Sequence, residues 1–341
     1  MKMNVTVVLA THNRAHGLPG TLQELAASQV ASSTAWEVIV VDNNSTDNTR
    51  EVIQQFCLRF PGRFRYVFEP RPGKSYALNT GVREAMGEIL AFMDDDVRVD
   101  ASWLENLTTP LAGRQWAGTG GRTLLADPFT PPDWMSASGS ETLLGILAAV
   151  FDHGPDQCRL DLPPYGANMA FRREMFEKYG LFRTDLGPSP DRNVPRPNED
   201  TEFGRRLMVA GEPLLYQPSA LVYHPVLKNR VQRSYFLAWH FDYGRAMVRE
   251  WECGPKILGI SRRRLTLLKL LGVSLPWESV RWLFTANPQK RFFRKCWVWA
   301  AAGQIVEVYR ELQQARLAGG RPQRPEIEFI APQLGAWQIP K

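Results

Sequence analysis

The 341-residue sequence is poor in cysteine, and none of its cysteines stands at metal-binding spacing. Cys57, Cys158, Cys253 and Cys296 lie far apart and form no CxxC pair. The sequence therefore offers neither a zinc site nor a disulfide framework. We expect reduced thiols in a cytoplasmic setting.

Long apolar runs are also missing. No stretch of 18 apolar residues occurs, so we expect no transmembrane span. The apolar run from Val5 to Ala10 is too short for the core of a signal peptide, and no small-residue cleavage site follows it. Both observations favour a cytoplasmic protein.

Acidic residues are scarce in one region only. Residues 255–300 contain ten lysines and arginines but a single acid, Glu278, which gives a local charge of +9. The whole chain carries +6, so the remainder carries −3. The basic character is therefore a C-terminal feature rather than a property of the whole chain.

Apolar runs alternate with helical patterns over the first 100 residues. Short apolar, β-branched runs are typical of strands buried on both faces of a parallel sheet. The alternation predicts an α/β fold with a doubly wound, mostly parallel sheet, helices on both faces and a cleft at its carboxyl edge. The expected strands are 4–10, 36–41, 64–68 and 89–93. Helices are expected at 17–31 and 76–86. A further helix between them should be capped by Ser45 or Thr46 and end near Arg59.

Three consecutive carboxylates, Asp94, Asp95 and Asp96, follow the strand 89–93 directly. Three adjacent acids cannot share the burial of the strand, so we expect them on a loop at its carboxyl end, where α/β sheets bind ligands. Neither GxGxxG nor GxxxxGK[ST] is present, which disfavours a dinucleotide fold and a P-loop. A divalent cation bound by the three carboxylates is then the group available to bind a phosphate. The alternative is that the three acids form a solvated turn without a ligand.

The alternation ends after residue 100. A helix at 101–112 and a glycine-rich stretch at 118–121 are followed by a long loop at 126–142. The segment 185–197 is too rich in proline for a helix or an inner strand, so we expect a surface loop and a candidate lid. The remaining expected elements are a strand entering a helix at 165–173, a helix beginning at Asn198, and two short strands at 214–217 and 220–223.

Six segments now stand together in order: VVLATHNR (7–14), VVDNNSTDNT (40–49), KSYALNTG (74–81), ILAFMDDDV (89–97), GANMAFRREMF (166–176) and NEDTEFGRRL (198–207). This set resembles the family-2 glycosyltransferases with the GT-A fold, over residues 4–226. The resemblance implies a GT-A domain at 1–226, with a nucleotide-binding half (1–98) and an acceptor half (99–226). It also implies an inverting transfer from a nucleotide-diphosphate sugar, with a UDP-sugar favoured, to a hydroxyl of a glycan or lipid-linked acceptor.

The resemblance assigns roles to individual residues. It places Thr11, Arg14 and Asp42 at the nucleotide, and Asp94 and Asp95 toward the ribose and the metal shell. Asp96 resembles the direct ligand of Mn²⁺ or Mg²⁺, and His224 the second protein ligand. One imidazole among oxygens suits Mn²⁺ somewhat better than Mg²⁺. Asp200 resembles the catalytic base.

The remaining assignments are less direct. Arg71 and Lys74 would add positive charge near the diphosphate, and ordinary loop solvation is the alternative for both. Gly166, Asn168 and Glu199 are expected on the acceptor or sugar side, although the charges of Glu199 and Glu202 also suit a helix N-terminus. The chain has Gly-Ala-Asn at 166–168 where many relatives have Gly-Gly-Asn, which leaves the acceptor open. His12, His16, His153 and His240 receive no role.

The resemblance ends near Val231, and residues 227–318 are expected to form a basic, aromatic-rich helical extension with a helix at 231–251. The composition of 255–300 suits helices lying on an anionic membrane surface at the cytoplasmic face. The alternative is a helical subdomain that packs its aromatics on the sheet. Nucleic-acid binding is disfavoured because no such module is present. Residues 319–341 are expected to form a loose proline-rich tail.

Two other functions fit parts of the sequence. A nucleotidyltransferase making a nucleotide sugar shares the carboxylate–metal chemistry, but it has no evident use for the segment 198–207. A non-catalytic sugar-nucleotide or glycan-binding protein would be expected to lack Asp96 or Asp200, and both are present.

Overall fold

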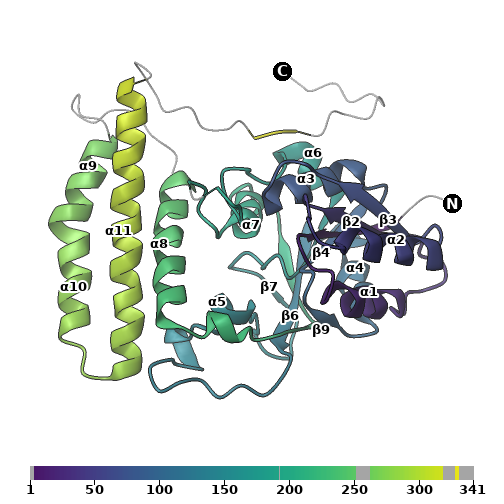
Figure 1. The fold of residues 1–341 in the computed structure, drawn as a ribbon, viewed down its shortest axis with the longest axis horizontal. Coiled ribbons are helices and arrows are strands. Elements are labelled where there is room, and N and C mark those ends of the chain that lie inside the picture. The colour runs from purple at the N-terminus through teal and green to yellow at the C-terminus, as the bar shows by residue number, and fades with distance from the viewer. Residues whose placement is uncertain (1–3, 192, 251–261, 318–326, 330–341) are drawn as a thin grey trace.

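The computed structural model describes residues 4–191, 193–250, 262–317 and 327–329 (Figure 1). A nine-stranded sheet runs through its centre, in the order β3-β2-β1-β4-β8-β6-β9-β5, with β7 paired to β9. The first four strands are parallel and follow the predicted apolar runs: β1 (Val5–Thr11), β2 (Trp36–Asp42), β3 (Phe64–Phe68) and β4 (Ile89–Met93).

The second half of the sheet is mixed. Strand β8 is antiparallel to β4 and β6, β6 is parallel to β9, and β5 and β7 pair antiparallel with β9. These strands are β5 (Arg98–Val99), β6 (Gly118–Leu125), β7 (Cys158–Arg159), β8 (Asn168–Arg172) and β9 (Leu214–His224). The predicted α/β fold with a mostly parallel sheet and a helical C-terminal extension is confirmed.

Helices cover both faces of the sheet because successive strand residues point to opposite sides. Along β1, Val7 and Leu9 join one apolar core with α1, whereas Val8 joins the other with α3. The helices of this part of the chain are α1 (Leu18–Ala26), α2 (Thr49–Arg59), α3 (Lys74–Glu84), α4 (Trp103–Thr108), α5 (Leu144–Ala148), α6 (Arg173–Tyr179) and α7 (Glu199–Val209).

Two local predictions were wrong. Neither Ser45 nor Thr46 caps α2, whose N-cap residue is Asn48. Ser45 and Thr46 instead bind the loop after β1, where Ser45 Oγ accepts a hydrogen bond from the Asn13 amide and the Thr46 amide donates to Asn13 Oδ1. The two strands expected at 214–223 are the single strand β9, which keeps its pairing to β6 through a register shift beside Pro218.

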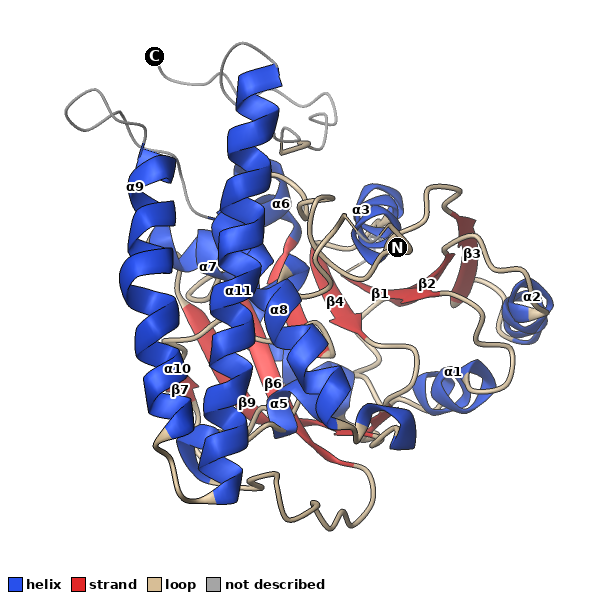
Figure 2. Cartoon of the chain, turned by 60° about the vertical axis from the view of Figure 1, so that its left-hand side comes forward, coloured by secondary structure: helices blue, strands red, loops and turns tan. Residues whose placement is uncertain are grey.

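The C-terminal helices form a layer beside the sheet, in which α11 lies between α8 and α10 (Figure 2). Two glycines let α8 and α11 approach closely. A Cβ atom on Gly244 would stand 1.9 Å from the Ala300 carbonyl oxygen, and one on Gly303 would stand 2.0 Å from that of Phe241. The layer consists of α8 (Arg233–Glu250), α9 (Arg262–Lys269), a π-helical turn (Leu270–Ser274), α10 (Leu275–Leu283) and α11 (Pro288–Leu317).

Aromatic residues join this layer to the sheet domain. Phe236 of α8 and Phe292 of α11 are buried against Trp134 and Met135 of the long loop. Part of the aromatic content is therefore used in packing, as the subdomain alternative proposed. In the part of the chain that the structure describes, no helix combines the length and the apolar content that crossing a bilayer demands.

The division of the chain at residue 226 stays a prediction. Most of the predicted tail at 319–341, and residues 255–261 of the basic segment, lie outside the described residues. The short described piece 327–329 contacts the sheet domain, where the Leu181 amide donates to the Glu328 carbonyl at 2.7 Å.

Candidate active site

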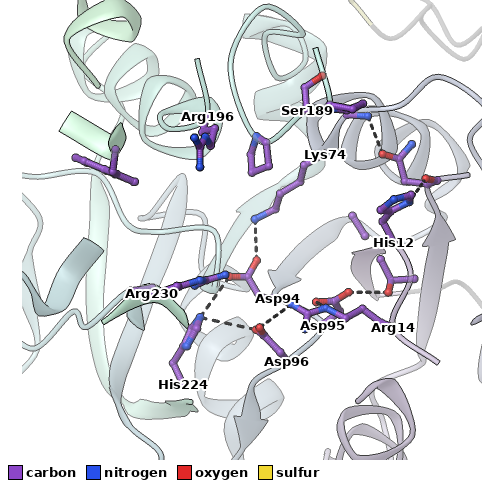
Figure 3. A pocket seen from close by; sticks show the side chains of 18 of the residues that line it. His12, Arg14, Lys74, Asp94, Asp95, Asp96, Ser189, Arg196, His224 and Arg230 are labelled. Atoms are coloured by element: carbon purple, nitrogen blue, oxygen red, sulfur yellow. Dashed lines mark hydrogen bonds and ion pairs between the residues drawn. The ribbon is translucent and has the colours of Figure 1, made fainter. Parts of the chain in front are cut away.

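A cavity of about 850 Å³ opens at the carboxyl ends of β1, β2 and β4. Loops after these strands form one wall, the proline-rich loop forms a second, and α5 and α8 form a third. Figure 3 shows the charged side chains converging on it. The lining includes Thr11, His12, Arg14, Asn43, Lys74, Asp94, Asp95, Asp96, Pro188, Ser189, Arg196, His224, Arg230, Tyr235 and Trp239.

Asp94, Asp96 and His224 form a cluster on the cavity floor. Each offers one ligand atom, and the three atoms lie within 4.8 Å of one another. The Nε2 atom of His224 lies 3.9 Å from Asp94 Oδ2 and 3.8 Å from Asp96 Oδ1. Both distances exceed hydrogen-bonding range, so the imidazole does not satisfy either carboxylate.

A hydrogen bond on the other side of the imidazole ring orients it. Nδ1 of His224 lies 2.9 Å from the Pro225 carbonyl oxygen, which only accepts, so Nδ1 carries a proton. Nε2 then faces two carboxylates, an arrangement also found in histidines that bind metals through one ring nitrogen and donate the other N–H to a carbonyl. Two carboxylate oxygens and one imidazole nitrogen fit Mn²⁺ or Mg²⁺.

Asp95 turns away from this cluster. Its carboxylate accepts a hydrogen bond from Thr11 Oγ1 at 2.6 Å and lies 3.3 Å from Nε of Arg14. Burial raises the pKa of Asp95 to about 6, although Arg14 and Thr11 oppose the shift. Arg14 also donates to Asp96 Oδ2 at 2.8 Å, so this guanidinium holds both carboxylates in place.

Lys74 supplies the second cation of the site. Its Nζ lies 2.7 Å from Asp94 Oδ1 and 3.5 Å from Glu199 Oε1. Burial disfavours its charge, but Asp94, Glu199 and Asp200 outweigh this and raise the pKa of Lys74. Lys74 is the first residue of α3, and its amide donates to the Pro188 carbonyl. It therefore joins the carboxylate loop to the proline-rich loop.

Asp200 stands in the first turn of α7, beside the cavity residues rather than among them. Its Oδ2 accepts from the Gly166 amide at 2.5 Å, and its Oδ1 from the Thr201 amide at 2.7 Å. Gly166 permits this approach, because a Cβ atom there would lie 3.0 Å from Asp200 Oδ2. Burial and the neighbouring Asp200 charge raise the pKa of Glu199 to about 7.

Six residues from the sequence-based prediction do not line the cavity: Gly166, Glu199 and Asp200, described above, and Asp42, Arg71 and Asn168. Asp42 is buried at the end of β2, where it accepts from the Ser45 amide and the Tyr66 hydroxyl. Arg71 forms a bidentate pair with Glu69, at 2.8 and 2.9 Å. Asn168 is 2 % exposed, and its amide binds Trp103 Nε1 and the carbonyls of Arg122 and Ala220. Its contacts thus hold the sheet together.

The comparisons with known proteins agree with this geometry. The family model described as "Glycosyl transferase family 2" matches residues 6–180, just over half of the chain. The chain belongs to glycosyltransferase family 2. It is a sugar-transferring enzyme.

Several relatives of this family-2 glycosyltransferase carry descriptive names. The succinoglycan biosynthesis protein ExoM of Rhizobium meliloti (strain 1021) is 27 % identical over 71 % of this chain and 74 % of its own. Glycosyltransferase AglE of Haloferax volcanii is 25 % identical over 70 % and 75 %. The glucosyl-dolichyl phosphate glucuronosyltransferase of the same organism is 24 % identical over 72 % and 75 %.

A solved structure supports the fold. The mannosyltransferase PcManGT from Pyrobaculum calidifontis, determined in complex with GDP-Man and Mn²⁺, is similar with a TM-score of 0.57. The similarity covers 90 % of this chain and 88 % of that one, at 19 % sequence identity. The described chain thus follows the GT-A architecture beyond the segment that the family model matches.

The structure adds cavity residues that sequence reasoning missed. Arg196 comes from the proline-rich loop, Arg230 follows β9, and Tyr235 and Trp239 lie one turn apart on α8. The sequence predicts this helix, and the four-residue spacing places both aromatics on one face. No signal in the sequence shows that this face turns toward the cavity.

Proposed function

We propose that this family-2 glycosyltransferase is a metal-dependent, inverting enzyme. It moves a sugar from a nucleotide-diphosphate sugar, with a UDP-sugar favoured, to a hydroxyl of a glycan or lipid-linked acceptor. The observation that carries the proposal is the Asp94–Asp96–His224 cluster, with Nε2 of the imidazole facing two carboxylates and with Arg14 and Lys74 beside it.

Asp94, Asp96 and His224 would hold the cation, and when bound it neutralises the diphosphate leaving group. Arg14 and Lys74 add fixed positive charge on either side. Thr11 and Asp42 end the neighbouring strands β1 and β2, so we keep them at the nucleotide. Because Lys74 lines the cavity and Arg71 does not, Lys74 is the better counterion for the diphosphate.

Asp200 would accept the proton of the acceptor hydroxyl. Its oxygens each accept one backbone hydrogen bond, which orients the carboxylate and leaves lone pairs for the substrate. The hydroxyl oxygen forms the new bond to the anomeric carbon, the bond to the diphosphate breaks, and the proton passes to Asp200. Attack from the face opposite the diphosphate inverts the anomeric configuration.

The names of relatives bear on the two substrates. The dolichyl phosphate enzyme of Haloferax volcanii and the succinoglycan protein of Rhizobium meliloti support a lipid-linked or glycan acceptor. The structure with GDP-Man and Mn²⁺ supports a nucleotide-diphosphate donor and a metal, and it keeps GDP-sugars beside UDP-sugars as donors to test. Tyr235 and Trp239 supply flat apolar surfaces on which a sugar ring can lie.

Replacing Asp200 with Asn tests the assigned base. We expect donor binding, measured by calorimetry with Mn²⁺ present, to stay within about threefold of wild type, while transfer falls by about a thousandfold. Asp191→Asn, on an exposed part of the proline-rich loop, is the matched control and should keep full transfer. Loss of donor binding in the Asp200 variant would show that the base assignment is wrong.

A thermal-shift screen with Mn²⁺ across UDP-, GDP-, CDP- and dTDP-sugars tests the donor class. We expect stabilisation by nucleotide-diphosphate sugars of one base. Stabilisation by nucleoside triphosphates instead would favour the nucleotidyltransferase alternative. Binding of a sugar nucleotide without release of its diphosphate, in the presence of glycan and polyprenyl-phosphate acceptors, would favour the non-catalytic alternative.

A further inference from the structure

Large apolar side chains line the solvent-facing side of α9, the π-helical turn and α10. The exposed fractions of these residues range from 48 % to 84 %. We call this surface the α10 outer face, and it consists of Leu268, Leu271, Trp277, Val280, Leu283 and Phe284.

The fold of the layer does not need these side chains. The opposite side of the same segment packs inward, where Leu267 and Leu270 meet Ile305 and Val308 of α11. Helix α10 contacts α11 and yet buries none of its residues fully. Exposed apolar surface of this extent marks an interaction site rather than a packed core.

The charge around the α10 outer face decides between two occupants. Residues 262–284, the segment that carries this face, contain five lysines and arginines and one acid, a net charge of +4, and Arg263 among them pairs with Glu311 of α11. Lys269 and Arg281 lie within the apolar stretch and are exposed. A second copy of the chain would bring the same positive charge against this face, whereas an anionic lipid surface attracts it.

We propose that the α10 outer face binds an anionic membrane surface, with Trp277 and Phe284 entering the headgroup region. Tryptophan and phenylalanine beside lysine and arginine are typical of helices that lie in the plane of a membrane interface. The absence of a spanning helix in the described residues fits attachment to one leaflet. This attachment does not rest on the proposed donor, metal or catalytic base.

The position of α10 gives the attachment a geometric consequence. Helix α10 packs on α11, α11 packs on α8, and α8 carries Tyr235 and Trp239 at the cavity (Figure 2). A membrane bound at the α10 outer face would therefore lie on the far side of α11 and α8 from the cavity, and the helical layer would fix the orientation of the cavity relative to the lipid surface.

Vesicle flotation of the full chain tests the proposal. We expect it to float with phosphatidylcholine vesicles that contain about 30 % phosphatidylserine, and not with phosphatidylcholine alone. The double variant Trp277→Ser/Phe284→Ser should bind the anionic vesicles about tenfold more weakly. Raising the salt from about 0.1 M to about 0.5 M should weaken binding of the wild type, because the electrostatic attraction is screened.

The double variant Leu58→Ser/Val209→Ser is the matched control. It removes two apolar side chains, 82 % and 83 % exposed, that are at least as exposed as Trp277 (61 %) and close to Phe284 (84 %), but that lie on α2 and α7. It should float like the wild type. Thermal unfolding of all three proteins, with melting temperatures in agreement, shows that the comparison is made between folded chains.

Three results would overturn the proposal. The first is a wild-type chain that stays with the unbound fraction. The second is a Trp277→Ser/Phe284→Ser variant that floats as well as the control. The third is a wild-type dimer in sedimentation that this variant dissociates, because the α10 outer face would then join two copies of the chain.

Discussion

Buried charges occur in two regions of the molecule and are arranged differently in each. In the helical layer, Glu307 accepts hydrogen bonds from Nε of Arg245 at 3.0 Å and from Nε of Arg249 at 2.8 Å. On the cavity floor, the imidazole of His224 stands 3.8 and 3.9 Å from the carboxylates of Asp96 and Asp94. The first group is closed by direct hydrogen bonds. In the second, Arg14 and Lys74 bind one oxygen each of Asp96 and Asp94, but the oxygens that face His224 are beyond hydrogen-bonding range of it.

This difference in hydrogen bonding distinguishes charged groups that stabilise the fold from charged groups that are available to bind a ligand. Arg245 and Arg249 also donate to the Asn193 carbonyl, both at 2.6 Å, so the closed group fastens the proline-rich loop to the helical layer. Charges that satisfy one another hold a fold together, whereas charges that face a cavity at greater distances can bind a ligand. The comparison predicts which substitutions change activity and which change stability.

Asp96→Ala should have the largest effect and should act on activity alone. We expect transfer to fall by at least about a thousandfold because a proposed metal ligand is lost. Stability should hold or rise, since one of three adjacent carboxylates is removed. Diphosphate release with and without Mn²⁺ measures the activity, and urea unfolding measures the stability.

Asp133→Ala, which replaces an exposed acid outside the cavity, is the control. Turnover retained with unchanged Mn²⁺ dependence would remove Asp96 from the metal site.

Glu307→Gln should instead lower the stability of the protein. The substitution removes the carboxylate that faces two buried guanidinium groups, so we expect the free energy of unfolding to fall by about 4 kcal/mol. Urea unfolding measures it. Glu177→Gln removes a half-exposed carboxylate that pairs with the mostly buried Arg173, and it should cost about 1 kcal/mol or less. Equal losses in the two variants would contradict the structural role of the Glu307 group.

His240 adds a pH dependence to the same layer. Burial lowers the pKa of His240 to about 4, partly offset by its hydrogen bond to the Phe236 carbonyl. A folded-state pKa below the ordinary value of about 6.5 means that the unfolded chain takes up the proton first, so stability is lost as the pH falls from about 6.5 to about 4. At about pH 5 the loss from this group should be about 2 kcal/mol.

His240→Phe should remove that loss. Urea unfolding of both proteins at about pH 7 and about pH 5 measures the difference in their pH dependence. A variant whose stability falls with pH as steeply as that of the wild type would show that His240 is not the responsible group.

Arg71→Ala should have the smallest effect. Its guanidinium pairs with Glu69 and is half exposed, so we expect transfer to change by less than about threefold. Lys74→Ala, three residues away but in the cavity and paired with Asp94, should weaken donor binding by at least about tenfold. A larger loss for Arg71 than for Lys74 would show that the loop rearranges when donor binds.

The strands of the parallel half were predictable because strands buried on both faces appear as continuous apolar runs. Strand β6 was not, because Gly118-Thr119-Gly120-Gly121 has low strand propensity. These glycines are there for close packing, since a Cβ atom on Gly118 would stand 2.3 Å from the Phe171 ring. Such a requirement belongs to the folded neighbour and does not show in the local sequence.

The candidate site was predictable to a similar degree. The end of a buried strand places Asp94, Asp95 and Asp96 at the ligand edge, but it does not say which carboxylate meets His224, a residue 128 positions after Asp96. In the structure Asp94 joins Asp96, while Asp95 turns to Thr11. The roles of the individual residues stay predictions until the substitutions are made.

The paired glycines of α8 and α11 also govern the order in which the chain can fold. Gly244 and Gly303 are 59 residues apart, and each needs the other helix's backbone against it. During synthesis the parallel half of the sheet can form early, but α8 meets its partner only after α11 has been made. The cavity wall that carries Tyr235 and Trp239 should thus be the last to become ordered, after the strands that end at Thr11 and Met93.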